Sequence, residues 1–431
     1  MRDMPMWGIN VLAFRVTVTG AALQPGNIPL INSPMTVEMT QLQSMAAYLN
    51  TVPVPQGNYT GITFTFANPR LTFFNNTGYG GMMGGVSCPT DQICEVTPPT
   101  LSGSTTITGS PFPFDAQGGT SLGLMMDFDL TDSFQGTNFW GMGFSPMMSG
   151  FFQTLGTDVG GFGGFFDEMP DMIGQVTSVD TADNKFTMRF MQFAPSLTFT
   201  VDDKTTYQGF DAIGKPNNLS GLAVGQIVEV DVDLLGPGTL YASEVNLESQ
   251  SAEETEGLVT GIDNASGWCE IVVMNEVPDF SGVSVGDVIR MGWQTGTTFD
   301  MDFDGMPMSG WGFSGISDLM PGQVIQFQTG SGLTPGTPPE ASVTRMRLMS
   351  SWVTGTISQM LNSSDFTIKP STGIFSAAGI NSLHVTTLPQ TRFDGVSGVS
   401  GLSVGTTVSL RGPLFANGGK PVLVALYVLK R

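Results

Sequence analysis

The segment 300–305 carries the residues best suited to bind a metal ion. Asp300, Asp302 and Asp304 alternate with apolar residues and precede a glycine. In such a D-x-D-x-D-G pattern, three carboxylates can supply the hard oxygen ligands that calcium prefers. The twelfth position of the loop is Trp311, however, where an EF-hand requires a bidentate Glu. We therefore predict either a simple surface calcium site or, in preference, a strand whose acidic side chains face water. No other cofactor is expected.

The three cysteines predict one disulfide and one free thiol. Cys88 and Cys94 flank a loop of five residues, a spacing that a disulfide can close and that zinc or thioredoxin motifs do not use. Such a staple forms in an oxidising compartment. Cys269, between Trp268 and Glu270, alternates like a strand residue, and we expect it to be a buried free thiol.

The sequence lacks the usual parts of a nucleophilic enzyme. Its single histidine, His384, lies in a strand-like segment, so His-rich zinc sites, Ser-His-Asp triads and Cys-His dyads cannot be assembled in their usual form. Carboxylates such as Asp167 and Glu168 could do acid–base work in a glycosidase, but nothing places two of them across a cleft. We predict that the protein is not an enzyme and has no catalytic residues.

The 26 methionines allow a second metal hypothesis. Thioethers are soft ligands for Cu(I), yet the methionines form no M-x-x-M series and have no histidines beside them. Packing by a polarizable side chain is the better explanation of their number.

Charge restricts the partners. Sixteen basic and 37 acidic residues give a net charge of -21, a field that repels phosphate backbones and anionic lipid. Nucleic acid is therefore excluded as a partner. The sequence contains no stretch of about 18 apolar residues, the length needed to span a membrane. Its first residues also lack the apolar region of a signal peptide. Together with the disulfide, these features predict an exported, extracellular or cell-surface protein whose signal or lipid anchor is not present in this chain.

Strand patterns and Gly/Pro/Asn turns recur throughout, and they predict an all-β protein. Residues 1–135 alternate like an antiparallel β-sandwich: Phe14, Val16 and Val18 point one way, with a wet face opposite. One short helix is expected within residues 37–49. Residues 136–172 are rich in Gly, Phe and Met, which predicts a linker or an irregular loop because glycine at this density does not hold a regular strand.

One sequence motif occurs three times in the last 260 or so residues. Each copy begins with a short predicted strand. Further along, a turn at a glycine precedes a second segment in which apolar and polar residues alternate; these glycines are Gly225, Gly322 and Gly405. The period is too long for a solenoid repeat and suits a small closed barrel. We predict three tandem small OB-like β-barrels behind the sandwich, at residues 173–250, 256–350 (with an insertion) and 352–431. The closing strand at 421–429 is unusually apolar, which predicts either burial on both faces or pairing with another element.

Residues 173–431 resemble the repeated module named domain of unknown function 5666, found in extracytoplasmic bacterial proteins. The pattern is carried by the segments 174–176, 199–209, 222–225 and 242–247 in the first copy and by 391–395 and 402–405 in the third. The second copy departs most, with Pro321 in place of a valine. Residues 9–135 look like the β-sandwich that precedes this module in soil-bacterial lipoproteins. Both resemblances imply an exported, envelope-associated, non-catalytic protein.

The Gly-rich loops suggest a function. Large apolar side chains on turn-prone backbone are expected to face outward, where they mark interfaces. The candidate interface residues are Phe139, Trp140, Met142, Phe144, Phe162, Phe165, Phe166, Trp293, Phe303, Met306, Met308, Trp311 and Phe313. We predict a structural or adhesive envelope protein that contacts itself or another envelope protein, and a filament or surface layer is one version. The alternative is a cell-surface module that binds polysaccharide or calcium through loops at the barrel mouths.

Overall fold

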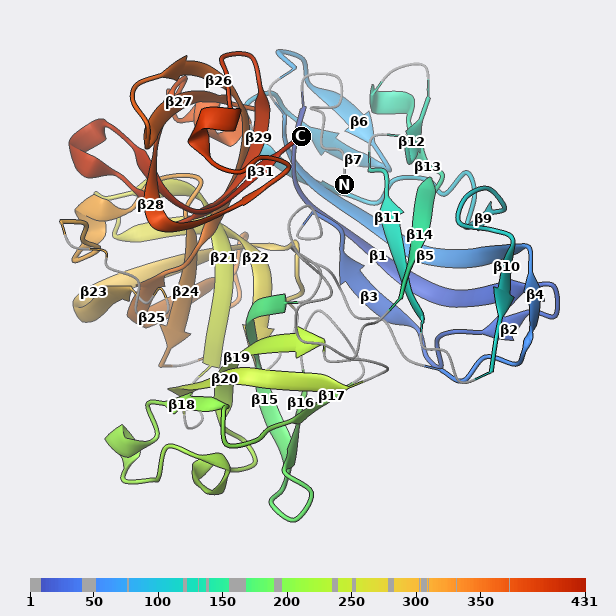
Figure 1. Ribbon diagram of the computed structural model, residues 1–431. Coiled ribbons are helices and arrows are strands. Elements are labelled where there is room, and N and C mark those ends of the chain that lie inside the picture. The colour runs from blue at the N-terminus through green and yellow to red at the C-terminus, as the bar shows by residue number, and fades with distance from the viewer. Residues whose placement is uncertain are drawn as a thin grey trace.

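Strands dominate the computed structural model of the chain (Figure 1). The structure describes residues 9–40, 52–75, 77–118, 122–130, 132–136, 139–154, 168–189, 196–234, 239–249, 253–277, 283–301, 303, 308, 310–330, 332–371 and 373–431. The predicted all-β class is confirmed: an N-terminal sheet domain is followed by three small barrels. The segment 37–49, expected to be helical, begins with the end of a strand, and its residues 41–49 lie outside the described part.

The N-terminal domain is built on one antiparallel sheet in the order β2-β1-β5-β8, with β3 also paired to β1 and β9 to β5. Its strands are β1 (Ile9–Gln24), β2 (Ile28–Pro29), β3 (Met35–Glu38), β5 (Gly61–Asn75), β8 (Ile93–Val96) and β9 (Ser104–Ile107). Alternation along β1 and β5 buries one face, as predicted: Phe14, Val16 and Ile62 are fully enclosed.

Short strand pairs cover this buried face (Figure 1). They are β4 (Gly57–Tyr59) with β10 (Phe114–Ala116), β11 (Leu122–Phe128) with β14 (Met148–Thr154), and β12 (Phe134–Gln135) with β13 (Gly143–Phe144). The β12–β13 pair inserts Phe144 beside Phe14, with ring centroids 5.4 Å apart. The strand pairs therefore place residues 139–154 with the sandwich rather than in the linker expected over 136–172, and Phe144 completes its core.

The first and second barrels follow. The strands of the first are β15 (Glu168–Asp180), β16 (Lys185–Arg189), β17 (Leu197–Thr200), β18 (Thr206–Gln208), β19 (Ile227–Leu234) and β20 (Leu240–Ser249). Those of the second are β21 (Glu253–Asp263), β22 (Trp268–Val277), β23 (Val288–Met301), β24 (Val324–Thr329) and β25 (Glu340–Leu348).

The third barrel has the same plan. Its strands are β26 (Ser351–Met360), β27 (Asp365–Pro370), β28 (Leu383–Asp394), β29 (Thr407–Gly412), β30 (Leu414–Phe415) and β31 (Val422–Lys430), with the helix α1 (Gly373–Ala377) between β27 and β28. In every barrel the first strand pairs with the second and fourth, and the third strand closes the ring by parallel pairing with the fifth. This is the strand order of the OB-fold.

The repeated glycine turn precedes the fourth strand of each barrel, after the 3-10 turns η4 (Leu219–Gly221), η5 (Ile316–Asp318) and η6 (Val399–Gly401). Gly225, Gly322 and Gly405 have φ of 92°, 94° and 89°, the left-handed region that glycine enters without steric cost. Each glycine N–H donates at 2.9 Å to a first-strand carbonyl, from Gly225 to Val176, from Gly322 to Val259 and from Gly405 to Ile357. The three glycine turns therefore make the same contact with the first strand of their barrel.

A threonine recurs where the third strand of each barrel is interrupted. Register is lost there between the two halves of the parallel pairing with the fifth strand. A hydroxyl satisfies a carbonyl at the gap in each barrel: Thr205 donates to Ala242 at 2.8 Å, Thr297 to Val343 at 2.8 Å and Thr391 to Ala425 at 2.6 Å. The threonine thus replaces a missing ladder hydrogen bond.

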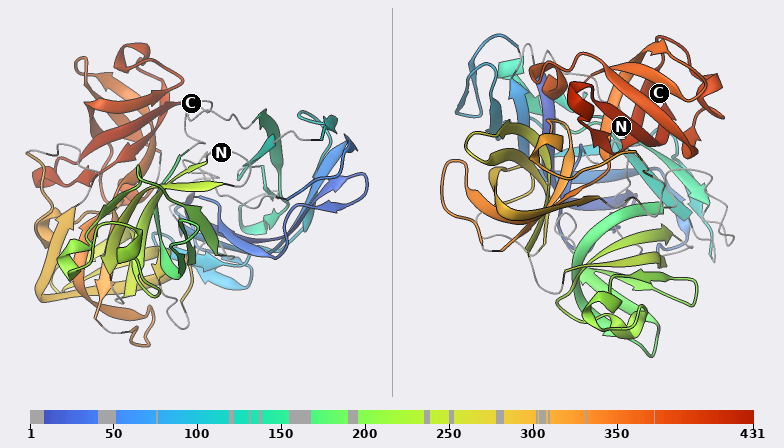
Figure 2. Two further views of the ribbon diagram at one scale, coloured as in Figure 1. Left: turned by 60° about the horizontal axis from the view of Figure 1, so that its bottom comes forward. Right: turned by 90° about the vertical axis from the view of Figure 1, so that its left-hand side faces the viewer.

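The barrels lie on one side of the sandwich (Figure 2). Leu12 and Ala13 of β1 are buried in a cluster with residues of the third barrel. Thr72 of β5 donates a 2.6 Å hydrogen bond to the carbonyl of Gly286 in the second barrel. The outer face of the sheet, expected to be wet, is therefore partly covered, because two barrels pack against it.

Neighbouring barrels also share apolar contacts. Ile173 and Ile227 of the first barrel cluster with Val324 and Met349 of the second. The closing strand β31 is buried on both faces, the first of the two predicted alternatives. Leu423 points into the core of the third barrel, whereas Val424 joins the core of the second. The second barrel is thus packed against both of the others.

Candidate functional site

Most of the predicted interface residues of the second barrel are internal. Phe303, Met308 and Phe313 retain only 7, 9 and 4% of their exposure and belong to the core of that barrel. Trp293 and Trp311 are partly buried against the same core. The expectation that this insertion faces outward is wrong for these residues, because the insertion closes the barrel between β23 and β24.

Two of the N-terminal interface candidates are also buried. Met142 and Phe144 are inside the sandwich, and the partly exposed Trp140, in the 3-10 turn η2 (Phe139–Gly141), covers Gly81 of the strand β6 (Gly81–Met83). These side chains complete the sandwich, which corrects the outward expectation for Met142 and Phe144. The remaining candidates lie outside the described part: Met306, Phe162, Phe165, Phe166 and the side chain of Phe139.

The proposed calcium ligand Asp300 is already neutralised by cations. Its two carboxylate oxygens accept hydrogen bonds from Arg345 Nε at 2.7 Å and Arg347 Nε at 3.3 Å. Both arginines also pair with Glu248 of the first barrel, which is 2% exposed. Asp302 and Asp304 lie outside the described residues. Within the described ranges, no group of three or more His, Cys, Asp or Glu side chains is placed to hold a metal ion.

His384 belongs to a polar cluster on the third barrel. Its Nε2 lies 3.1 Å from one oxygen of Asp365, which Thr386 also donates to at 2.7 Å. Asn362 and Ser364 donate to the other oxygen. Burial alone raises the pKa of Asp365, but these hydrogen bonds outweigh it and lower the pKa to about 2. The carboxylate is thus fully used in holding the β27–β28 surface.

The cysteines are as predicted. Cys88 and Cys94 form a disulfide with Cα atoms 5.7 Å apart, within the usual range. Cys269 is a buried free thiol inside the second barrel, and burial raises its pKa to about 12. It is therefore inert as a nucleophile at neutral pH.

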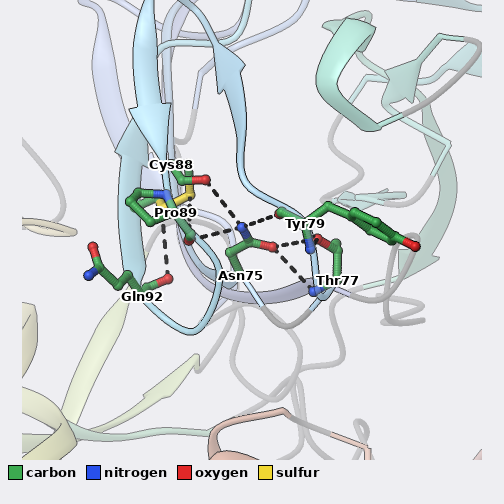
Figure 3. The surroundings of a disulfide bond; sticks show 7 residues. Asn75, Thr77, Tyr79, Cys88, Pro89 and Gln92 are labelled. Atoms are coloured by element: carbon green, nitrogen blue, oxygen red, sulfur yellow. Dashed lines mark hydrogen bonds between the residues drawn. A yellow bond between two sulfur atoms is a disulfide. The ribbon is translucent and has the colours of Figure 1, made fainter.

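The disulfide anchors an exposed hairpin made of β6 and β7 (Val86–Cys88). Beside it, the fully buried side-chain amide of Asn75 donates to the carbonyls of Tyr79, Cys88 and Pro89 at 2.9, 3.3 and 3.0 Å. The same Asn75 accepts from the backbone N–H and hydroxyl of Thr77 (Figure 3). The loop is therefore fixed at both ends by covalent and hydrogen-bonded contacts.

This hairpin carries large apolar side chains into solvent. Tyr79, Met82 and Val86 are 76, 58 and 40% exposed, and the Tyr79 ring points away from Asn75 and the disulfide (Figure 3). We call residues 77–94 the stapled hairpin. The glycine-rich segment 78–85 beside the cysteine loop indicated a turn-rich region in the sequence. The pattern of apolar and polar residues could not show which of its side chains are exposed.

A second surface lies on the outside of the second barrel, where side chains of the second and third strands, Trp268 and Arg290 among them, are half-buried. Trp268 of β22 is directly opposite Gly292 of β23, and Glu270 is opposite Arg290. The Arg290 guanidinium lies 4.4 Å from the centre of the Trp268 ring. Sequence reasoning missed this group because Trp268 begins an ordinary alternating strand and Arg290 is distant along the chain.

Corresponding positions of the other barrels carry different groups. Lys185 and Thr187 stand there in the first barrel, and Asp365 and Thr367 in the third. An aromatic ring at this position is thus particular to the second barrel.

Two family models match parts of the chain. The model described as domain of unknown function 5666 matches residues 173–246 and 354–428, which are the first and third barrels. The model described as domain of unknown function 4382 matches residues 3–146, the sandwich. The predicted resemblance to domain 5666 is confirmed. The second barrel has the same strand order although its sequence departs most from the pattern. No curated protein matches the chain.

Proposed function

We propose that this chain is a non-catalytic, extracytoplasmic structural and adhesive protein that associates with a second copy through the stapled hairpin. The observation that carries this assignment is the exposure of Tyr79, Met82 and Val86 on a loop held by Cys88–Cys94. Apolar side chains on a backbone that is already fixed lose less conformational entropy on binding, and exposed apolar side chains are typical of interfaces. The proposed contact site is therefore the hairpin and not the Gly/Phe/Met-rich loops predicted from the sequence, because the described candidate residues of those loops are largely buried.

Charge favours this hairpin as the point where two copies meet. The whole chain has a net charge of -21, yet Asp91 is the only ionisable acidic or basic side chain between residues 77 and 94, apart from Tyr79. Two like-charged molecules approach with least repulsion where their surfaces are nearly neutral. Raising the salt concentration screens the remaining repulsion, so association through the hairpin should tighten with salt.

Backbone geometry supports the same partner. Among the described residues, β6 and β7 pair only with each other, so the outer edge of each strand has no neighbouring strand. An identical hairpin can pair with such an edge. A two-fold contact of this kind closes as a dimer, and a filament or surface layer would need a second surface.

Several features support a non-catalytic role. His384 contacts a carboxylate already engaged by three other groups, and the free thiol of Cys269 is enclosed. The disulfide supports export, since such bonds persist in oxidising compartments. No helix in the described ranges is long and apolar enough to cross a membrane.

Sedimentation velocity of the full chain tests the proposed association. We expect a monomer–dimer equilibrium that shifts toward dimer between roughly 20 and 150 mM salt, where the Debye length falls to about 8 Å. The double variant Tyr79→Ser/Met82→Ser should remain monomeric. Leu101→Ser, which changes an exposed leucine outside the hairpin, is the matched control and should dimerise as the parent does. A parent chain that stays monomeric at high concentration and salt would overturn the proposal.

A further inference from the structure

We propose that the outer face of the second barrel binds a neutral oligosaccharide through Trp268. This goes beyond the association proposed above and stands on a different surface. In OB-folds, the second and third strands, together with the loops after the first and fourth strands, form the ligand face. In the second barrel these four parts meet at Trp268 and Arg290.

The two loops flank the indole. Trp268 follows the turn 264–267 directly, and Asp263 at its start accepts hydrogen bonds from the N–H groups of Ala265 and Ser266. On the other side, the carbonyl of Pro339, at the end of the loop after β24, accepts a 2.8 Å hydrogen bond from the Arg290 N–H. Both loops are therefore held against the strands that carry the ring.

A glycine leaves room beside the ring. Gly292 is the cross-strand partner of Trp268, so no side chain projects from the position directly opposite. Gly267 precedes the tryptophan, and the Trp293 indole nitrogen lies near it. Arg290 covers part of the Trp268 ring, which fixes its orientation before a ligand arrives. A preorganised aromatic platform of this kind loses less entropy on binding.

The groups around the platform are acidic and hydrogen-bonding. Glu340 pairs with Arg290 at 3.4 Å and is itself 58% exposed, while Thr260 donates to the Glu270 carbonyl at 3.1 Å. Burial raises the pKa of Glu270. Carboxylates and a guanidinium can accept from and donate to sugar hydroxyls, and the apolar face of a pyranose can stack on indole.

Electrostatics selects a neutral ligand. Asp263, Glu270 and Glu340 outnumber Arg290 at this surface, and the chain as a whole is strongly acidic. Phosphate backbones and uronic acids would therefore be repelled. A neutral hexose or N-acetylhexosamine chain meets no such penalty.

Isothermal titration of the full chain with hexasaccharides of β-linked glucose, mannose and N-acetylglucosamine tests the site. We expect saturable binding of at least one of them. Trp268→Ala should weaken it roughly 10- to 100-fold, the range of an aromatic hot spot. Trp352→Ala is the matched control, because Trp352 forms a similar pair with Arg411 at 5.4 Å on the first and fourth strands of the third barrel. It should leave the affinity unchanged.

A second variant keeps the test sharp if removal of Trp268 disturbs folding. A Cβ at Gly292 would meet only Ala341 and Gly267 carbonyl oxygens, at 3.6 and 3.8 Å, so Gly292→Leu fits the strand and fills the space beside the ring. We expect it to abolish binding while the circular dichroism spectrum stays unchanged. Absence of saturable binding to all three sugars, binding that Gly292→Leu leaves intact, or tighter binding of oligogalacturonate or oligothymidylate would each overturn the inference.

Discussion

Trp311 of the second barrel stacks on Phe415 of the third, with ring centroids 5.1 Å apart and planes 23° from parallel. The same junction includes a 2.8 Å hydrogen bond from Gln323 Nε2 to the Leu414 carbonyl. A tryptophan that the sequence predicted to contact a partner thus contacts the neighbouring barrel of its own chain. The two barrels are therefore expected to unfold together.

Replacing Trp311 by Ala should separate these unfolding transitions. Loss of the stack and of the buried part of the indole should cost about 2–3 kcal/mol. Differential scanning calorimetry would show an additional or broadened transition in the variant. Tyr79→Ala, at an exposed position, should leave the thermogram of the monomer unchanged, and identical profiles for both variants would contradict the junction.

A substitution at Phe144 tests whether its segment belongs to the core or forms an exposed adhesive loop. Its ring is fully buried among Phe14, Phe66 and Phe128, so Phe144→Ala should lower the free energy of unfolding by about 3–5 kcal/mol. Denaturant unfolding measures this loss. Leu101→Ala, 61% exposed, should change stability by less than about 0.5 kcal/mol. A small loss of unfolding free energy in Phe144→Ala would contradict the burial of this segment.

Glu248 joins the first two barrels electrostatically. It is 2% exposed and lies 2.5 Å from Arg347 Nη1, while Arg345 Nη1 lies 3.7 Å away. Burial lowers the pKa of Arg347, but the charges of Glu248 and Asp300 outweigh it and raise the pKa. Glu248→Gln leaves two partly buried cations undercompensated and should cost about 2–4 kcal/mol in chemical denaturation. The exposed counterpart Glu340→Gln should cost at most about 1 kcal/mol; equal costs would contradict the buried network.

The cluster around Asp365 gives a pH dependence with a definite sign. Its folded-state pKa is lowered from 3.8 to about 2, so the carboxylate stabilises the fold above about pH 4. This contribution should be lost as the pH falls from about 4 through 2. Because the side chain is partly exposed, we expect at most about 1–2 kcal/mol. The stability difference between the parent and Asp365→Asn, followed by urea unfolding, should shrink across this window; a constant difference would contradict the cluster.

Sequence patterns were sufficient for the architecture because period-2 alternation and left-handed glycine turns are local. Gly225, Gly322 and Gly405 need positive φ wherever the rest of the chain lies. What packs on an outward face is decided by partners distant along the chain. Ala13 and Thr72 lie on the face opposite Phe14, which was expected to be wet, but other barrels cover them. Phe144 and Phe313 read as loop residues but fill cores. For the same reason, the Trp268–Arg290 pair could not be foreseen from either strand alone.

The most direct test of the proposed association is hydrogen–deuterium exchange of the full chain at low and high concentration. If two copies meet at the stapled hairpin, slowing of exchange on concentration should be confined to residues 77–94. The variant Cys88→Ser/Cys94→Ser, which frees the loop and loses about 2 kcal/mol of stability, should show little of this protection. Protection that instead appears on the barrels, or exchange that does not depend on concentration, would contradict the account.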